Sequence, residues 1–247
     1  MSQRLKLVIA YDGAVFAGWQ SQTHRNTVQD KLEQAFQKII GARIRVHGAG
    51  RTDAGVHALA QCAHVDLPER RLSAERWTGA LNASLPATIR VLRCQFVSQN
   101  FHARFSAKGK VYHYRIWAAP ILPPLEFSRA WHISPPLDVD LLEEAGERFV
   151  GTHDFAAFAA NRGKKEEKTV RTIWSVQVRR NGPRVTIEVA GDGFLYKMVR
   201  LMIGAMTRAA LGKMNPAEIT SRLKSGRADG VRFVAPAEGL YLAKIWY

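Results

Sequence analysis

The chain has 247 residues, 47% of them hydrophobic, which indicates a folded protein with a sizeable core and excludes a disordered one. Its 36 Lys and Arg outnumber the 21 Asp and Glu, and the resulting net charge of +15 favours a polyanionic partner. The two cysteines, Cys62 and Cys94, form no CxxC motif or Cys/His cluster, so we expect no structural zinc site and a reducing compartment.

The first half of the chain alternates between strand-like and helix-like patterns. An apolar run over residues 5–11 predicts a strand that ends at Asp12-Gly13. Apolar residues at helical spacing then predict a helix over residues 28–40, which Thr27 can cap and Gly41 can end. The following patterns predict a strand over 43–49, a strand over 58–67, a helix over 73–85 and a strand over 88–97. The expected order is β-α-β-β-α-β.

The second half repeats this order with extra pieces. We expect strands at 111–118, 170–179, 184–190 and 240–247, and helices at 139–150, 194–211 and 216–225. Residues 180–183 are suited to a hairpin turn between the second and third of these strands. The pattern predicts an α+β protein of two ferredoxin-like βαββαβ units, with a largely antiparallel sheet, helices on one face and a central basic cleft. The expected domains are residues 1–105 and 106–247.

The excess positive charge is confined to three segments of the second half. Residues 101–129, 161–184 and 197–232 carry 21 of the 36 basic residues and only five of the 21 acidic ones. A shared anionic ligand is a reason to concentrate like charges in this way. No signal peptide precedes the first strand, and no uncharged run is long enough to span a membrane, so we expect a cytoplasmic protein without a membrane partner.

A glycine-rich loop between two expected strands could carry chemistry. Residues 48–57 read Gly-Ala-Gly-Arg-Thr-Asp-Ala-Gly-Val-His, with Arg51 and Asp53 between glycines. Glycine allows close approach of a ligand, Arg51 could hold a phosphate, and Asp53 could act as a nucleophile or a base. Taken alone, these residues favour a plain turn with Asp53 bonded to main-chain amides, because turn chemistry often explains Gly and Asp.

This loop resembles the signature loop of the TruA-type tRNA pseudouridine synthases, and other motifs of that family follow in the same order. The matching motifs are Tyr11-Asp12-Gly13 with residues 16–20, residues 27–29, residues 100–107 with Tyr112-His113-Tyr114, residues 151–155, residues 194–200 and residues 238–242. The resemblance covers nearly the whole chain, and residues 66–76 and 161–168 are the least similar parts.

The resemblance implies an isomerase that converts uridine to pseudouridine at positions 38, 39 and 40 of tRNA. It implies a homodimer in which one tRNA anticodon arm reaches across both subunits. The reaction imports no group and has no net redox change, so no cofactor and no metal are expected. This agrees with a sequence that contains neither a Rossmann fingerprint nor a P-loop.

The resemblance also implies roles for individual residues. Asp53 corresponds to the catalytic carboxylate, Tyr112 to the aromatic residue that stacks on the extruded base, and Arg200 to the basic partner of the catalytic Asp. Arg51 would contact phosphate or the flipped nucleotide, and Leu240 would form an apolar wall of the pocket. Lys197 and Arg208 lie with Arg200 and Gly204 on one helical stripe, which makes both candidates for RNA binding. Without the resemblance, Tyr112 would be a sheet or core tyrosine and Leu240 a core residue, and a solvated face of an otherwise buried helix would explain the stripe as well as RNA binding does.

Two other functions are compatible with the residues alone. A non-catalytic RNA-binding or chaperone protein would share the basic segments but would not need Asp53. A basic enzyme acting on a small molecule would leave the segregated charge unexplained and would bind its ligand without a strong dependence on salt.

Overall fold

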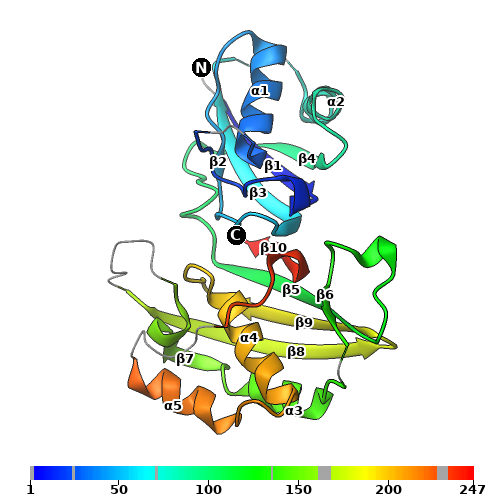
Figure 1. Ribbon diagram of the computed structural model, residues 1–247. Coiled ribbons are helices and arrows are strands. Elements are labelled where there is room, and N and C mark those ends of the chain that lie inside the picture. Colours follow the sequence, from blue (N-terminus) through cyan, green and yellow to red (C-terminus); the bar gives the residue numbers. More distant parts are fainter. Residues whose placement is uncertain (1–2, 24–25, 70–71, 135, 161–167, 227–232) are drawn as a thin grey trace. The chain divides into compact units, whose positions relative to one another are not determined.

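The computed structural model describes residues 3–23, 26–69, 72–134, 136–160, 168–226 and 233–247. Within these ranges the chain is an α+β protein with five α-helices and ten strands, and most strand pairs are antiparallel (Figure 1). The expected α+β class and the largely antiparallel pairing are therefore confirmed. The chain divides into two compact units, Met1–Lys108 with Tyr241–Tyr247, and Gly109–Leu240.

The first unit has the β-α-β-β-α-β order that its sequence predicts. Its elements are β1 (Gln3–Tyr11), α1 (Val28–Ile40), β2 (His47–Gly48), β3 (His57–Leu67), α2 (Ala74–Ser84) and β4 (Ile89–Val97), joined by β10 (Leu240–Trp246). β1 lies between β4 and β3 and is antiparallel to both. β2 pairs with the middle of β3, and β10 pairs in parallel with the start of β3.

The core of the first unit is built from one face of β1 and the apolar faces of its helices. Leu5, Leu7 and Ile9 are fully buried and alternate with partly exposed residues, as expected for a strand with one face in the core. Phe36 of α1 and Trp77 of α2 are also buried, with ring centres 5.5 Å apart. The Thr27 hydroxyl accepts a hydrogen bond from the Asp30 amide, and this confirms the predicted start of α1.

The second strand of this unit is much shorter than predicted. We expected it over residues 43–49, but only His47 and Gly48 pair with β3. The Val46 amide donates to the Glu33 carboxylate (3.1 Å), and the Val46 carbonyl accepts from the Gln29 side chain (3.2 Å). Because side chains of α1 satisfy these main-chain groups, residue 46 needs no strand partner.

The second unit contains more strands than its sequence predicted. Its elements are β5 (Gly109–Ala118), β6 (Trp131–Ile133), α3 (Val139–Glu147), β7 (Gly151–Asp154), β8 (Val170–Asn181), β9 (Arg184–Gly191), α4 (Met198–Ala210) and α5 (Ala217–Ser225). The sheet order is β5-β9-β8-β7, with β6 parallel to β5. β6 and β7 were missed because three or four residues are too few to show a strand pattern. The predicted β8–β9 hairpin is confirmed, and Gly182 in its turn has a φ of 58°.

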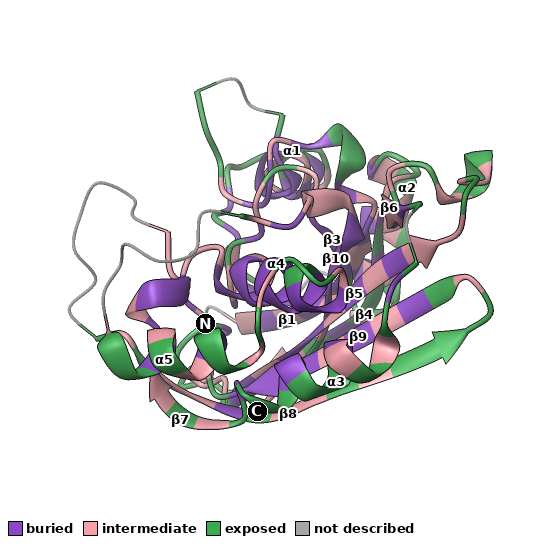
Figure 2. Ribbon diagram, turned by 60° about the horizontal axis from the view of Figure 1, so that its bottom comes forward, coloured by how far each residue is buried: buried purple, intermediate pink, exposed green. Residues whose placement is uncertain are grey.

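Helix α4 is the most deeply buried helix of the described part of the second unit (Figure 2). Arg200 and Arg208 are its residues that are not buried. It begins at Met198, four residues later than predicted, because Lys197 takes a left-handed conformation with a φ of 58° and interrupts the helical path before it. Its apolar face packs against α3.

The end of the chain does not belong with the residues that precede it. We expected the last strand in a domain spanning residues 106–247, whereas Tyr241–Tyr247 lie in the first unit, where Tyr241 and Leu242 pair with His57 and Ala58. In the described ranges, no helix has both the length and the apolar character that crossing a membrane requires.

Candidate active site

The glycine-rich loop that carries Asp53 is tied to β3 at its entrance and closed on itself at its exit. The Ala49 amide donates to the Cys62 carbonyl (2.8 Å), and the Gln61 side chain donates to the Gly50 carbonyl (3.0 Å). Beyond Asp53, the Val56 amide donates back to the Asp53 carbonyl at 3.1 Å, which closes a turn. Asp53 itself is half-buried at the tip of this turn.

Residues 11–19 form a second layer against the loop. The buried Tyr11 and Thr52 hydroxyls are hydrogen-bonded at 2.8 Å, and the Trp19 amide donates to the Thr52 carbonyl at 3.1 Å. Burial raises the pKa of the Tyr11 phenol well above its ordinary value, so this group remains neutral at physiological pH. Thr52, the residue before Asp53, is therefore fixed through both its side chain and its main chain.

Two glycines allow this second layer to approach the loop closely. A Cβ atom on Gly13 would lie 2.0 Å from the Val56 carbonyl oxygen, and one on Gly18 would lie 2.6 Å from the Thr52 carbonyl oxygen. Gly18 also has a φ of 94°, which side chains rarely adopt. Only glycine fits between the two segments, and this explains why the Tyr11-Asp12-Gly13 and residue 16–20 motifs accompany the loop.

His57 and Asp12 form a further contact that the sequence did not reveal. The Gly13 amide donates to His57 Nδ1 (3.1 Å), and Asp12 Oδ1 lies 3.2 Å from the same nitrogen. The His57 ring stacks on Tyr241 of β10, with centres 4.5 Å apart. His57 thus links the end of the loop both to residues 12–13 and to the last strand. Both residues lie in motifs of the sequence, but spacing alone could not show that they meet.

Arg51 is the second predicted residue of this loop, and its side chain is exposed two positions before Asp53. The loop therefore presents a carboxylate and a guanidinium on one short segment of the first unit. Among the described residues, no three His, Cys, Asp or Glu side chains are grouped to hold a metal ion. Cys62 and Cys94 are free and buried, and burial raises the pKa of both thiols.

The remaining predicted site residues belong to the second unit. Tyr112 of β5 is buried opposite Val189 of β9, and its ring meets the edge of Phe194 with centres 5.1 Å apart. Arg200 of α4 is half-buried, and its Nε donates to the Ala235 carbonyl (2.7 Å) while the Ala235 amide donates to the Arg200 carbonyl (3.0 Å). Segment 233–235 thus lies along α4 and orients the Arg200 side chain.

The predicted basic stripe of α4 is interrupted. A Cβ on Gly204 would lie 2.2 Å from the Phe233 carbonyl oxygen, so segment 233–235 covers the helix at this point. Lys197 precedes the helix, with its ammonium 5.3 Å from the Tyr196 ring centre, and exposed Arg208 donates to the Lys213 carbonyl at 3.3 Å near the other end. Leu240 is buried at the start of β10, as expected for an apolar wall or a core residue.

Known proteins resemble this chain over nearly its whole length. A family model described as tRNA pseudouridine synthase matches residues 7–106 and 145–247. The tRNA pseudouridine synthase A of Akkermansia muciniphila is 48% identical over 99% of this chain and 95% of that protein. The proteins of the same name from Geobacillus kaustophilus and Acetivibrio thermocellus are 42% and 40% identical, covering 100% and 99% of this chain and 95% and 100% of their own lengths.

Proposed function

Because this chain belongs to the tRNA pseudouridine synthase family, we propose that Asp53 is the carboxylate with which it isomerises uridine in tRNA. The protein is an RNA pseudouridine synthase, an isomerase that acts on tRNA. What remains to be assigned is the catalytic residue, the residues that bind the nucleotide, and the positions in tRNA that are modified.

The observation that carries the assignment of Asp53 is the way its neighbours are fixed. Thr52 is held by Tyr11 and Trp19, Val56 closes the turn, and the glycines at 13 and 18 bring the second layer within contact distance. A carboxylate that must meet one atom of the substrate needs such a preorganised support. A solvated surface turn would not need two layers of buried contacts to hold it.

We propose that Asp53 starts the reaction at the ribose of the target uridine. It either attacks the sugar as a nucleophile or removes a proton from it, so that the C1′–N1 bond breaks. Uracil then turns, and C5 bonds to C1′ as the sugar releases the Asp53 carboxylate or takes back its proton. C5 then loses its proton and N1 gains one, so the number of atoms and the oxidation state are unchanged. The target base must leave its stack before this chemistry, at a cost of about a few kcal/mol.

The second unit supplies the proposed partners of Asp53. Tyr112 stacks on the extruded base and assists proton removal from C5, Arg200 pairs with the Asp53 carboxylate, and Leu240 forms an apolar wall. The contacts of Arg200 with Ala235 support a guanidinium held in a fixed orientation. Arg51, Lys197 and Arg208 are the proposed phosphate contacts, and all three are at least partly exposed.

We further propose that the enzyme is a cytoplasmic homodimer that modifies positions 38, 39 and 40 in the tRNA anticodon arm. The β-α-β-β-α-β order and the pairing of β1 between β3 and β4 support a ferredoxin-like first unit, and we propose the same unit, with additions, for the second. A basic cleft would receive the anticodon arm, as the segregated positive charge suggests.

The assignment is tested with Asp53→Asn and the matched control Asp140→Asn, which makes the same change at an exposed position in the first turn of α3. Asp53→Asn should abolish pseudouridine formation while the Kd for tRNA stays within about threefold, because Asp53 acts on the ribose and all the proposed phosphate contacts remain in place. Asp140→Asn should keep full activity. Carbodiimide mapping of tRNA from cells lacking this protein, before and after incubation, measures both the yield and the modified positions. Turnover by Asp53→Asn would remove Asp53 from its role.

The same mapping addresses the alternative of a non-catalytic RNA-binding protein. Wild-type protein that binds tRNA without producing any new pseudouridine would favour that alternative. The family assignment weighs against it. If pseudouridine formed at positions other than 38, 39 and 40, the protein would still be a pseudouridine synthase, and only the proposed positions would be wrong.

A further inference from the structure

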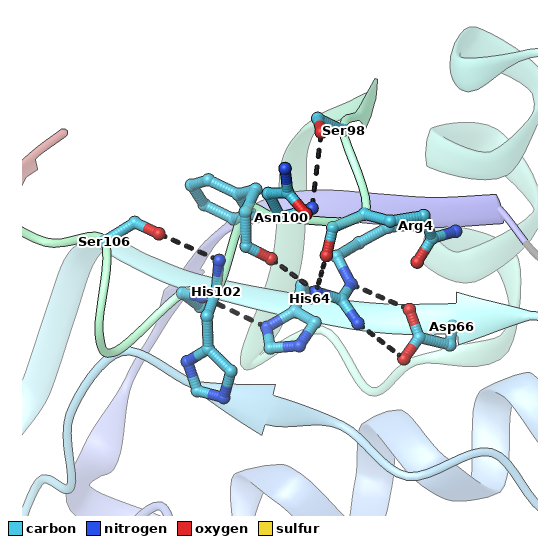
Figure 3. A network of polar contacts seen from close by, with 10 residues as sticks. Arg4, His64, Asp66, Ser98, Asn100, His102 and Ser106 are labelled. Carbon is cyan, nitrogen blue, oxygen red and sulfur yellow. Dashed lines mark hydrogen bonds and ion pairs between the residues drawn. The ribbon is translucent and has the colours of Figure 1, made fainter.

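A short turn in the first unit, His102–Ser106, holds an aromatic ring and a guanidinium out into solvent. The His102 amide donates to the Ser106 hydroxyl at 2.9 Å (Figure 3). The Ser106 amide donates to the His102 carbonyl, also at 2.9 Å, so the ends of the turn are joined twice. Between them, Phe105 is 78% exposed and Arg104 is also exposed. A phenylalanine this exposed contributes nothing to the core.

Imidazole rings hold the inside of this turn. The Ala103 amide donates to Nδ1 of buried His64 (3.2 Å), and the Arg104 and Phe105 amides donate to Nδ1 of His102 (3.1 and 3.3 Å). Three successive main-chain donors are thus bonded to two ring nitrogens (the first appears in Figure 3). An Nδ1 that accepts a hydrogen bond carries no proton, so both rings have their proton on Nε2 and are neutral.

The charges around the rings keep them neutral. Burial, followed by Arg4, His102 and His47, lowers the pKa of His64 to about 4, and the nearby Asp66 only partly opposes this. Burial, followed by His47, Arg4 and Arg104, also lowers the pKa of His102. The turn therefore keeps its shape throughout the physiological pH range.

The segment that leads into the turn is fixed by Arg4 of β1. Its guanidinium donates to the Phe101 carbonyl (2.7 Å), to the Gln99 carbonyl and to the Asp66 carboxylate (2.7 and 2.9 Å; Figure 3). Together with the imidazoles, these contacts make the turn a rigid support and not a loose loop. Holding exposed side chains in place costs conformational entropy. Binding of a ligand to these side chains would offset that cost and would explain why the turn is held rigid.

The exposed groups have the chemistry of a nucleotide-binding platform. The Phe105 ring stacks on His102 with centres 4.3 Å apart, and the Arg104 guanidinium carbon is 5.8 Å from the Phe105 ring centre. Lys108 follows the turn and is exposed, and residues 101–108 contain no acidic residue. An aromatic ring beside guanidinium and ammonium groups suits a base and its phosphate, because bases stack on aromatic faces and phosphates pair with cations.

We propose that the His102–Ser106 turn binds an unpaired nucleotide of the tRNA substrate, with the base stacked on Phe105 and a neighbouring phosphate on Arg104. The proposal rests on the proposed function in one respect: it takes the RNA bound here to be the tRNA that the enzyme modifies. It concerns binding alone and gives the turn no part in the chemistry at Asp53. His102 is a positioning residue, since it acts through the main chain of the turn.

The first test is Phe105→Ala, with Leu92→Ala as the matched control because Leu92 is an exposed apolar residue of β4 in the same unit. Loss of one stacking contact should raise the Kd for tRNA about tenfold, whereas kcat at saturating tRNA should stay within about twofold. Phe105→Trp should keep the wild-type Kd, and Leu92→Ala should change neither value. Asp53→Asn should show the opposite pattern, with lost turnover and retained affinity, so failure of either proposal is recognised separately.

The second test separates the charge from the stacking. Arg104→Gln should lower the slope of log Kd against log salt by about 0.7, the value for one contact to a single-stranded phosphate. The control Arg93→Gln, at an exposed position of β4, should leave the slope unchanged. His102→Ala should raise the Kd as Phe105→Ala does, while His102→Asn should restore it because the amide oxygen can replace Nδ1 as acceptor.

Two results would overturn the proposal. The first is a Kd for tRNA that Phe105→Ala leaves unchanged in a variant shown by circular dichroism to be folded. The second is a shift to a smaller species in sedimentation analysis of Phe105→Ala with tRNA affinity intact, since this would make Phe105 a contact between protein chains.

Discussion

At the scale of single residues, the position of Asp53 depends on neighbouring glycines, which have no Cβ atom and so allow close packing. Gly13 lies against the Val56 carbonyl, and the added methyl group of Gly13→Ala would overlap this main-chain oxygen, which cannot rotate away as a side chain could. The Cβ would lie 2.0 Å from this oxygen, and real Cβ atoms essentially never come within 3.0 Å of another heavy atom, so the two segments would have to separate by about 1 Å or more. A displacement of about 1 Å at a catalytic group can cost about 100-fold in rate.

We therefore expect Gly13→Ala to lower kcat about 100-fold and to leave the Kd for tRNA nearly unchanged. The matched control is Gly79→Ala in α2, where an added Cβ meets nothing within 4 Å. Replacing this exposed helical glycine should stabilise the protein by about 1 kcal/mol without changing kcat. Single-turnover assays and thermal unfolding measure the two effects, and wild-type kcat in Gly13→Ala would show that the second layer does not position Asp53.

Residue types in the sequence were sufficient to single out the loop but not its supports. Glycines around Arg51 and Asp53 indicated a turn whose side chains could act in catalysis, and the family resemblance favoured this interpretation over a plain turn. The contact of Asp12 and Gly13 with His57 was not predictable, because 44 positions separate Gly13 from His57 and no spacing rule links them. The acceptor role of His64 toward the amide of Ala103 was hidden for the same reason.

At the scale of elements, the sequence predicted which segments fold regularly better than it predicted where they begin. Apolar spacing identified α1 and α4 correctly, since burial of one face determines such helices. The late start of α4 depends on the left-handed conformation of one lysine, and the shortness of β2 depends on two side chains of α1. Each is decided at a single residue, by the conformation of Lys197 in one case and the hydrogen bonds of Val46 in the other.

The contact between β3 and the His102–Ser106 turn should make stability depend on pH through His64. The ordinary pKa of 6.5 applies to the unfolded chain, and the folded protein lowers it to about 4. Between these values the unfolded chain binds a proton that the folded protein does not. The contribution of neutral His64 to the free energy of unfolding is therefore fully present above pH 6.5 and is lost as the pH falls toward 4.

His64→Asn provides the comparison, because its amide oxygen can still accept from Ala103 but does not titrate. Between about pH 7.5 and about pH 4.5, the free energy of unfolding of the wild type should fall by about 2 kcal/mol more than that of the variant. Urea unfolding at both pH values measures this difference. Equal losses in the two proteins would mean that His64 titrates alike in the folded and unfolded states.

At the scale of the whole molecule, the chain order and the spatial units disagree at one point. Tyr241–Tyr247 complete the first unit by pairing with β3, although more than 130 residues separate them from Lys108. Local sequence pattern predicted the strand, but the choice of partner is made by long-range burial, which leaves no local signal. The total charge, by contrast, could be taken directly from the sequence.

The confinement of the positive charge to three segments predicts how tRNA binding responds to salt. Each phosphate contact contributes to the slope of log Kd against log salt, by roughly 0.7 for a single strand and roughly 0.9 for duplex DNA. Arg179 and Arg180 are exposed at the end of β8, within the second basic segment, whereas Arg90 and Arg93 are exposed on β4, outside all three. The two pairs carry the same charge but differ in location.

Replacement of Arg179 and Arg180 by Gln should raise the Kd for tRNA and reduce the salt slope by between about 0.7 and about 1.8, corresponding to one or two lost contacts. The same change at Arg90 and Arg93 should leave the slope unaltered, although both variants lose two positive charges. Binding measured from 50 to 200 mM salt distinguishes a local phosphate contact from a general effect of net charge. If both pairs lowered the slope equally, the tRNA would respond to total charge alone, and the segregation of basic residues would need another explanation.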